Sequence, residues 1–122
     1  MSQTFFIFIE PNSDVSETKR KLKDLLPGDW SDEIDSDDDS LCVVIKDNLH
    51  IGLYERNVFA DPAEHDEWRT YRQVMILNPL RTFPENDRPG DVVIEYASKI
   101  ARQFGWGVLA YVDLLTRLYP SE

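Results

Sequence analysis

The stretch Thr4-Phe5-Phe6-Ile7-Phe8-Ile9 is an unbroken apolar run near the beginning of the sequence. Pro11 and Asn12 follow it and end any regular element at that point. A strand with one solvated face alternates apolar and polar side chains, whereas a strand buried on both faces is apolar throughout. The run therefore predicts an inner strand of a sheet, and the rest of the fold is expected to form around it.

A helix is expected directly after this strand, because Asp14 followed by Glu17 is a capping arrangement. Apolar residues then recur at near-helical spacing, at Val15, Leu22, Leu25 and Leu26. Pro27-Gly28 ends the element. The outer face of this helix is basic, with Lys19, Arg20, Lys21 and Lys23, and it could partly neutralise the acidic residues that follow.

The middle of the sequence predicts two or three antiparallel strands. Residues 41–46 and 49–55 are strand-like, and Asp47-Asn48 between them suits a tight turn because Asp and Asn tolerate positive φ. Residues 68–77 predict a further strand. The aromatic residues that could line an open face of this sheet are Tyr54, Trp68 and Tyr71.

A second helix is expected from a cap at Asp91 to a left-handed C-terminal residue at Gly105. Its apolar face has the clearest helical period in the chain, with Val93, Tyr96, Ala97, Ile100, Ala101 and Phe104. Residues 106–112 fit either a strand or a helix that continues to Leu118. A strand followed by a short helical turn is favoured, because Gly105 stops the helix before it.

These elements predict an α+β fold in one domain, residues 1–122. Its architecture is a two-layer sandwich, with a mainly antiparallel sheet of four to five strands and two main helices on one face. A ferredoxin-like variant is one form of this arrangement.

The charge of the chain is concentrated in one place. The formal net charge is −10, from 23 acidic and 13 basic residues, and seven of the acids fall between Gly28 and Ser40. Such a balance repels phosphate backbones, so direct nucleic-acid binding is disfavoured, and a basic protein partner or a cation is expected. The single cysteine, Cys42, excludes an internal disulfide. With no signal peptide and no membrane span predicted, we expect a cytoplasmic protein that does not bind membranes.

No motif for catalysis, metal or cofactor binding is found. Asp35, Asp37 and Asp39 have the spacing of the first half of a calcium-binding EF-hand loop, but Ser40 and Lys46 stand where that loop needs Gly and Glu. The histidines, His50 and His65, lack metal-site spacing, although carboxylates surround His65 at Asp61, Glu64, Asp66 and Glu67. We therefore predict no cofactor and no catalytic residues.

The acidic segment is the strongest functional feature. It could be a solvated connector, or a surface in which Trp30 anchors a partner and the carboxylates around it steer a basic surface. Trp30 could instead fold back onto the domain as a core residue. The predicted partner-binding residues are Asp29, Trp30, Asp32, Glu33, Asp35, Asp37, Asp38 and Asp39.

As a single acidic α+β domain without enzyme motifs, the chain resembles small bacterial immunity proteins, which neutralise a toxin by covering its active site. The resemblance implies a non-enzymatic inhibitor whose partner is a basic toxin domain such as a nuclease. Two alternatives remain open: a nucleic-acid mimic that occupies DNA-binding proteins, and a small enzyme or metal protein built on His50, His65 and nearby carboxylates.

Overall fold

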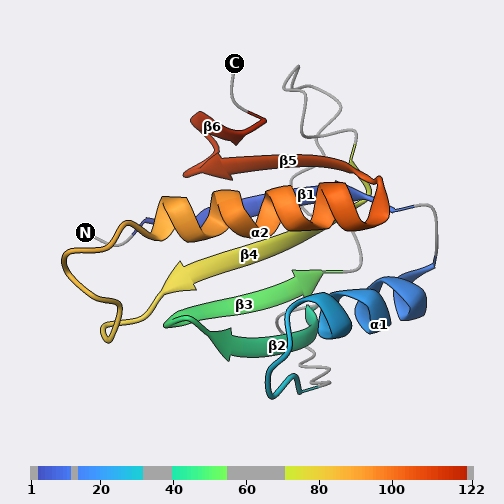
Figure 1. The fold of residues 1–122 in the computed structure, drawn as a ribbon, viewed down its shortest axis with the longest axis horizontal. Coiled ribbons are helices and arrows are strands. Elements are labelled where there is room, and N and C mark those ends of the chain that lie inside the picture. The colour runs from blue at the N-terminus through green and yellow to red at the C-terminus, as the bar shows by residue number, and fades with distance from the viewer. Residues whose placement is uncertain (1–2, 12–13, 32–39, 55–70, 121–122) are drawn as a thin grey trace.

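The computed structural model describes residues 3–11, 14–31, 40–54 and 71–120. They form one six-stranded antiparallel sheet, in the order β2-β3-β4-β1-β5-β6, with two helices (Figure 1). The strands are β1 (Phe5–Glu10), β2 (Ser40–Lys46), β3 (Leu49–Tyr54), β4 (Gln73–Pro79), β5 (Gly107–Val112) and β6 (Thr116–Tyr119). The helices are α1 (Val15–Leu25) and α2 (Pro89–Phe104), and both cover the same face of the sheet. The α+β class is confirmed, but the sheet has six strands instead of the expected four to five.

The N-terminal apolar run forms β1, an inner strand of the sheet, as predicted. Phe5 pairs with Leu77 on one side and with Val112 on the other, both antiparallel. Every residue from 5 to 9 is buried. Alternate side chains point to opposite faces of the sheet: Phe5, Ile7 and Ile9 pack in the cluster on the helix side, and Phe6 and Phe8 pack in a second cluster on the other face.

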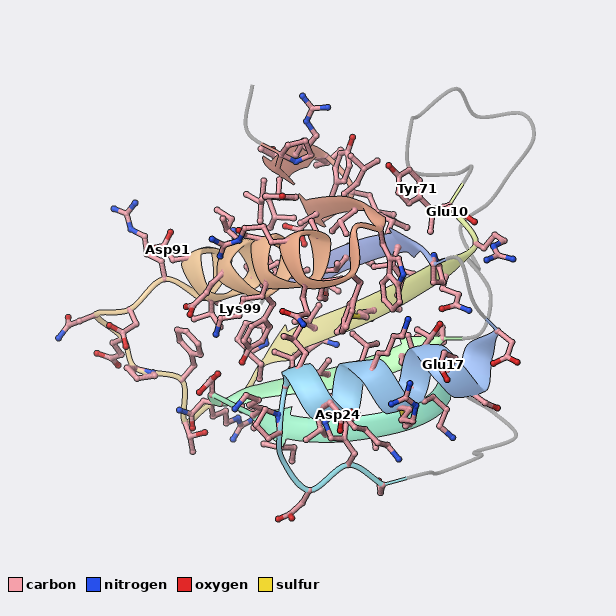
Figure 2. All side chains as sticks on the ribbon, turned by 45° about the vertical axis from the view of Figure 1, so that its right-hand side comes forward. Glu10, Glu17, Asp24, Tyr71, Asp91 and Lys99 are labelled. Carbon is pink, nitrogen blue, oxygen red and sulfur yellow. The ribbon has the colours of Figure 1, made fainter. Side chains whose placement is uncertain are left out.

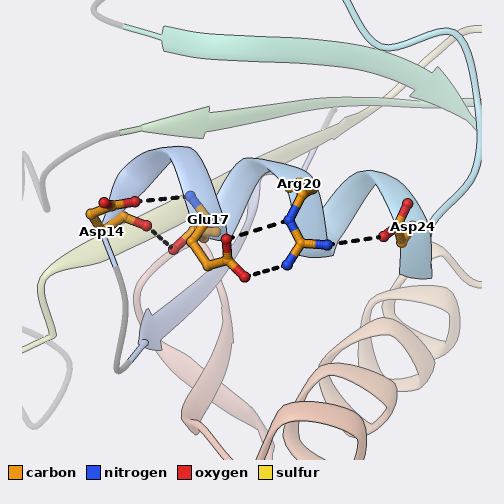
Figure 3. Close-up of polar contacts among 5 residues, drawn as sticks. Asp14, Glu17, Arg20 and Asp24 are labelled. Atoms are coloured by element: carbon orange, nitrogen blue, oxygen red, sulfur yellow. Dashed lines mark hydrogen bonds and ion pairs between the residues drawn. The ribbon is translucent and has the colours of Figure 1, made fainter.

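The first helix begins at the predicted cap. The Asp14 side chain accepts a hydrogen bond from the Glu17 amide at 3.0 Å, and α1 runs to Leu25. Figure 3 shows Asp14, Glu17, Arg20 and Asp24 in a row along its outer side. The inner side contributes Leu22 to the core, where it is fully buried.

The turn between β2 and β3 is also as predicted. Asp47 and Asn48 have φ values of 53° and 61°, which is the geometry of a two-residue hairpin turn. The pair Lys46 and Leu49 closes the hairpin.

The second helix starts earlier than expected. Its N-cap is Arg88, with no side-chain cap, and Pro89 opens the first turn, so the prediction of Asp91 as the cap is wrong. Proline suits this position because its fixed φ is helical and its missing N–H is not needed there. Gly105 at the other end has φ 68° and ends the helix as predicted.

Residues 107–112 form strand β5, so the favoured interpretation of this segment is confirmed, but the short helical turn expected after it is not found. Asp113 and Leu114 adopt φ values of 53° and 59° and reverse the chain into β6. Thr4 stabilises the reversal, because its carbonyl accepts from the Asp113 amide at 2.8 Å and its amide donates to the Asp113 carboxylate at 3.0 Å.

The ferredoxin-like variant is found only in part. Strands β4 and β5 are both antiparallel to β1, so they are parallel to each other, and α2 connects them across β1. This is one split β-α-β unit. The connection through α1 differs, because β1 and β2 are separated by β4 and β3 and run in opposite directions.

The face of the sheet away from the helices carries a second hydrophobic cluster. Its buried members are Phe6, Phe8, Val74, Leu109 and Tyr111, and Tyr54 and Tyr71 pack against it. Both tyrosines therefore lie where the sequence placed them, whereas Trp68 lies outside the described residues. Neither α1 nor α2 lies on this face.

One partly buried hydrogen bond ties α2 to the β2–β3 turn and gives a pH-dependent prediction. The Tyr96 hydroxyl donates to the Asp47 carboxylate, and burial, reinforced by this bond, raises the pKa of Tyr96 above its ordinary value. The folded protein holds this proton more tightly than the unfolded chain, so the contribution to stability is complete below about pH 10 and declines as the pH rises further. Tyr96→Phe is expected to lower the free energy of unfolding by about 1–2 kcal/mol at pH 7.

Urea denaturation at pH 7 and pH 10.5 measures this effect. The gap between the original protein and the Tyr96→Phe variant should narrow at the higher pH. An equal gap at both values would show that the Tyr96 proton is not linked to folding.

Candidate functional site

Trp30 lies at the start of the acidic segment and packs back onto the domain. Its indole N–H donates to the carbonyl of Leu26 at 2.8 Å, and its partly buried ring contacts the main core cluster. The N–H satisfies one of the carbonyls left free at the C-terminal end of α1. Trp30 thus has a structural role, and its role as an anchor for a partner remains a prediction.

The acidic run that follows Trp30 is held to the sheet at both ends. Ser31 exchanges two backbone hydrogen bonds of 2.9 Å with Val43 of the edge strand β2, and Ser40 is the first residue of the same strand. Asp29, just before the run, is exposed. The other predicted partner-binding residues, Asp32, Glu33, Asp35, Asp37, Asp38 and Asp39, lie outside the described residues. The described residues that flank the run are Ser31, which is bridged to Val43 of β2, and Ser40, the first residue of β2.

A second charged segment attaches at the same end of the sheet. Ser40 pairs with Tyr54, the last residue of β3, and Tyr54 pairs with Val74 of β4. Residues 55–70 connect these two strands. We call this end of the sheet, marked by Glu10, Ser40, Tyr54 and Gln73, the acidic end (Figure 1, right).

Almost all of the net charge of the protein belongs to the two segments, 32–39 and 55–70, whose flanking residues lie at this end of the sheet. The described residues contain eleven acidic and eleven basic side chains and are neutral as a set. Residues 32–39 contain six acids and no base, and residues 55–70 contain five acids and two bases. These two segments therefore hold nine of the ten net negative charges, and Glu122 holds the tenth.

An ion pair fixes the chain where residues 55–70 rejoin the sheet. Arg72 Nε lies 2.6 Å from Glu10 Oε1, and the Arg72 amide donates to Glu10 Oε2 at 3.0 Å. Figure 2 shows Glu10 and Tyr71 side by side at the acidic end, with Asp91 at the opposite end of the molecule. Arg72 therefore neutralises the carboxylate of Glu10 at this end of the sheet.

The basic face of α1 is engaged within the domain. Arg20 pairs with Glu17 and lies 3.7 Å from Asp24, and this hydrogen bond from Arg20 holds the pKa of Glu17 below its ordinary value (Figure 3). Lys21 lies 5.7 Å from the ring centres of both Phe104 and Trp106. These two cations of the basic face therefore have partners among the described residues.

The residues considered for metal or nucleophilic chemistry do not converge in the part of the chain that the structure describes. His50 is half-buried on β3, as expected, and Cys42 is a fully buried free thiol. Within residues 3–11, 14–31, 40–54 and 71–120, no three His, Cys, Asp or Glu side chains are grouped to hold a metal ion. His65 and the carboxylates around it lie outside these ranges.

A hollow of about 350 Å³ lies beside the edge strand β2, next to the start of the acidic run. Its lining residues are Asp29, Ser31, Val43, Val44, Ile45 and His50. Of these, the sequence pointed to Asp29 alone as a binding residue and to His50 as part of an alternative. Ser31, Val43 and Ile45 were missed, since a single β-bridge leaves no periodic pattern.

Comparison with known proteins identified no relative of this chain. A scan against protein-family models, a search of curated proteins and a search of solved structures each found no match to the chain. Neither described helix is long and apolar enough to cross a membrane.

Proposed function

We propose that the chain is a non-enzymatic binding module that inhibits a basic protein partner through the acidic end of the sheet. One observation carries the proposal: two separate segments with nine net negative charges attach to the same end of a domain whose described residues are otherwise neutral. Charges gathered at one place raise the rate at which an oppositely charged surface associates.

The resemblance to bacterial immunity proteins suggests the class of partner. A toxin domain that cleaves nucleic acid presents a basic cleft to phosphates, and an acidic surface is complementary to such a cleft. We therefore propose a basic toxin domain, such as a nuclease, as the partner. The predicted contacts are Asp29, Trp30 and the acids from Asp32 to Asp39.

The test begins with the partner. It is captured from the native cell on the immobilised protein, identified by mass spectrometry and purified for kinetics. The triple variant Asp37→Asn, Asp38→Asn, Asp39→Asn should associate about tenfold more slowly at low salt, because steering by these charges is lost. Its association rate should also depend less on ionic strength.

A matched control carries the same loss of charge at the other end of the molecule. Glu85→Gln, Asp87→Asn and Asp91→Asn remove three acids from the loop before α2 and its first turn, where all three side chains are exposed. This control should change the association rate less than twofold. Equal effects of the two triple variants would contradict a role for the acidic end.

The nucleic-acid mimic is distinguished by the same capture. A mimic binds several unrelated DNA-binding proteins and is displaced by duplex DNA, whereas an inhibitor of one toxin has a single tight partner.

A further inference from the structure

The backbone N–H and C=O of Ile45, on the edge strand β2, make no hydrogen bond with the described residues. In a two-residue hairpin the closing pair, Lys46 and Leu49, exchanges hydrogen bonds, so the next residue, Ile45, directs its N–H and C=O away from β3. Val43 points the same way by this alternation, and its two groups indeed bond to Ser31. Among the described residues, none bonds to the N–H or C=O of Ile45.

The segment of residues 28–31, which pairs with β2 at Val43, does not cover Ile45. After pairing with Val43 at Ser31, the segment bends, since the Trp30 amide bonds to the carbonyl of Gly28 at 3.0 Å. Gly28 lies over the helix side of β2, where an added Cβ would stand 3.1 Å from Val44 Cγ2. The Ile45 side chain is 64% exposed, one of two large hydrophobic side chains so exposed among the described residues.

The hollow between this bend and the edge offers two kinds of contact. Val43 and Ile45 supply apolar surface, and Asp29 supplies a carboxylate that makes no hydrogen bond or ion pair with the described residues. A lysine or arginine side chain fits both, because its aliphatic stem packs on apolar groups while its charged end pairs with a carboxylate. An extended peptide adds to a free strand edge through its backbone.

We propose that this hollow receives an extended segment of the basic partner. The segment pairs through its backbone N–H and C=O with Ile45, and one of its lysine or arginine side chains lies against Asp29. The inference rests on the proposed function for the identity of the partner. It adds a point of contact at Ile45, which would determine how the partner segment is aligned along β2.

The probe for this site is a capped peptide of sequence Lys-Val-Lys-Val-Lys-Val-Lys, titrated into the whole protein and followed by ¹⁵N NMR. Saturable shifts should centre on the amides of Asp29, Ser31 and Ile45, and hydrogen exchange at the Ile45 amide should slow at least tenfold. A peptide with glutamate in place of lysine, and one N-methylated at its central residues, should leave both readouts unchanged.

Three variants separate the site from general attraction by charge. Asp29→Asn should weaken peptide binding about fivefold, the size expected for a partly exposed ion pair. Asp87→Asn removes the same charge at the far end and should have little effect. Ile45→Pro removes an N–H that the sheet does not use and should abolish the localised shifts.

The outcomes distinguish the two proposals. Shifts that spread over the surface without saturation, or equal weakening by Asp29→Asn and Asp87→Asn, would overturn the site at Ile45 and leave the steering role of the acidic run standing. Should Ile45→Pro fail to fold, the N-methylated peptide still decides the backbone pairing. A localised site together with unchanged partner kinetics in the Asp37, Asp38, Asp39 variant would instead contradict the proposed function.

Discussion

Phe8→Ala is expected to lower the free energy of unfolding by about 3–5 kcal/mol, the range for truncating a buried aromatic side chain. Phe8 is fully buried, although it lies on the face of β1 turned away from both helices. Its ring centre is 6.2 Å from that of Phe6 and 6.2 Å from that of Tyr111, the latter in an edge-to-face contact. Because an ordinary domain has a free energy of unfolding of about 5–15 kcal/mol, a loss of this size is at least about a fifth of its stability.

Urea denaturation of the purified variants measures the loss, and Ile45→Ala is the control. Ile45 projects from the same face of the sheet, but it is 64% exposed, so its truncation should cost less than about 0.5 kcal/mol. A loss below about 1 kcal/mol for Phe8→Ala would show that the second cluster is not part of the stabilising core.

Trp30→Ala is expected to lower the free energy of unfolding by about 2–3 kcal/mol. The variant loses the packing of a partly buried ring on the core and the hydrogen bond to the Leu26 carbonyl. Trp30→Phe keeps most of the packing and loses the hydrogen bond, so about 1 kcal/mol is expected. Thermal unfolding followed by circular dichroism gives both values.

The Phe variant also separates the structural role of Trp30 from a role in binding. Because it should remain folded, any loss of partner affinity beyond the stability change reports a direct contact of the indole. An unchanged stability of Trp30→Ala would contradict the packing of this side chain on the domain.

The sequence predicted correctly those parts of the fold that depend on residues close together in the chain. The apolar run of β1, the cap at Asp14, the turn at Asp47 and Asn48 and the stop at Gly105 all follow from residue types at short range. Strand β6 was missed because Leu114 takes a positive φ, which is rare for a large side chain. The contacts of Asp113 with Thr4 hold that turn, and Thr4 is far away in the sequence.

Of the candidate site, too, the sequence could predict only the part that depends on residues close together in the chain. The excess of acids between Gly28 and Ser40 can be counted in the sequence. That residues 55–70 attach beside it could not be predicted, because the pairing of Ser40 with Tyr54 and of Tyr54 with Val74 depends on the register of three strands. That the Ile45 N–H and C=O have no partner among the described residues likewise follows only when β2 is known to be the edge of their sheet.

The central position of β1 also bears on the order in which the protein is completed during synthesis. Phe5 of β1 pairs with Leu77 of β4 and with Val112 of β5. Because these partners lie far along the sequence, they leave the ribosome long after β1 does. Until residue 112 has emerged, the most apolar strand of the chain lacks one of its two neighbours. We expect the nascent chain to expose this strand to chaperones and to fold slowly for its size, as chains rich in distant contacts do.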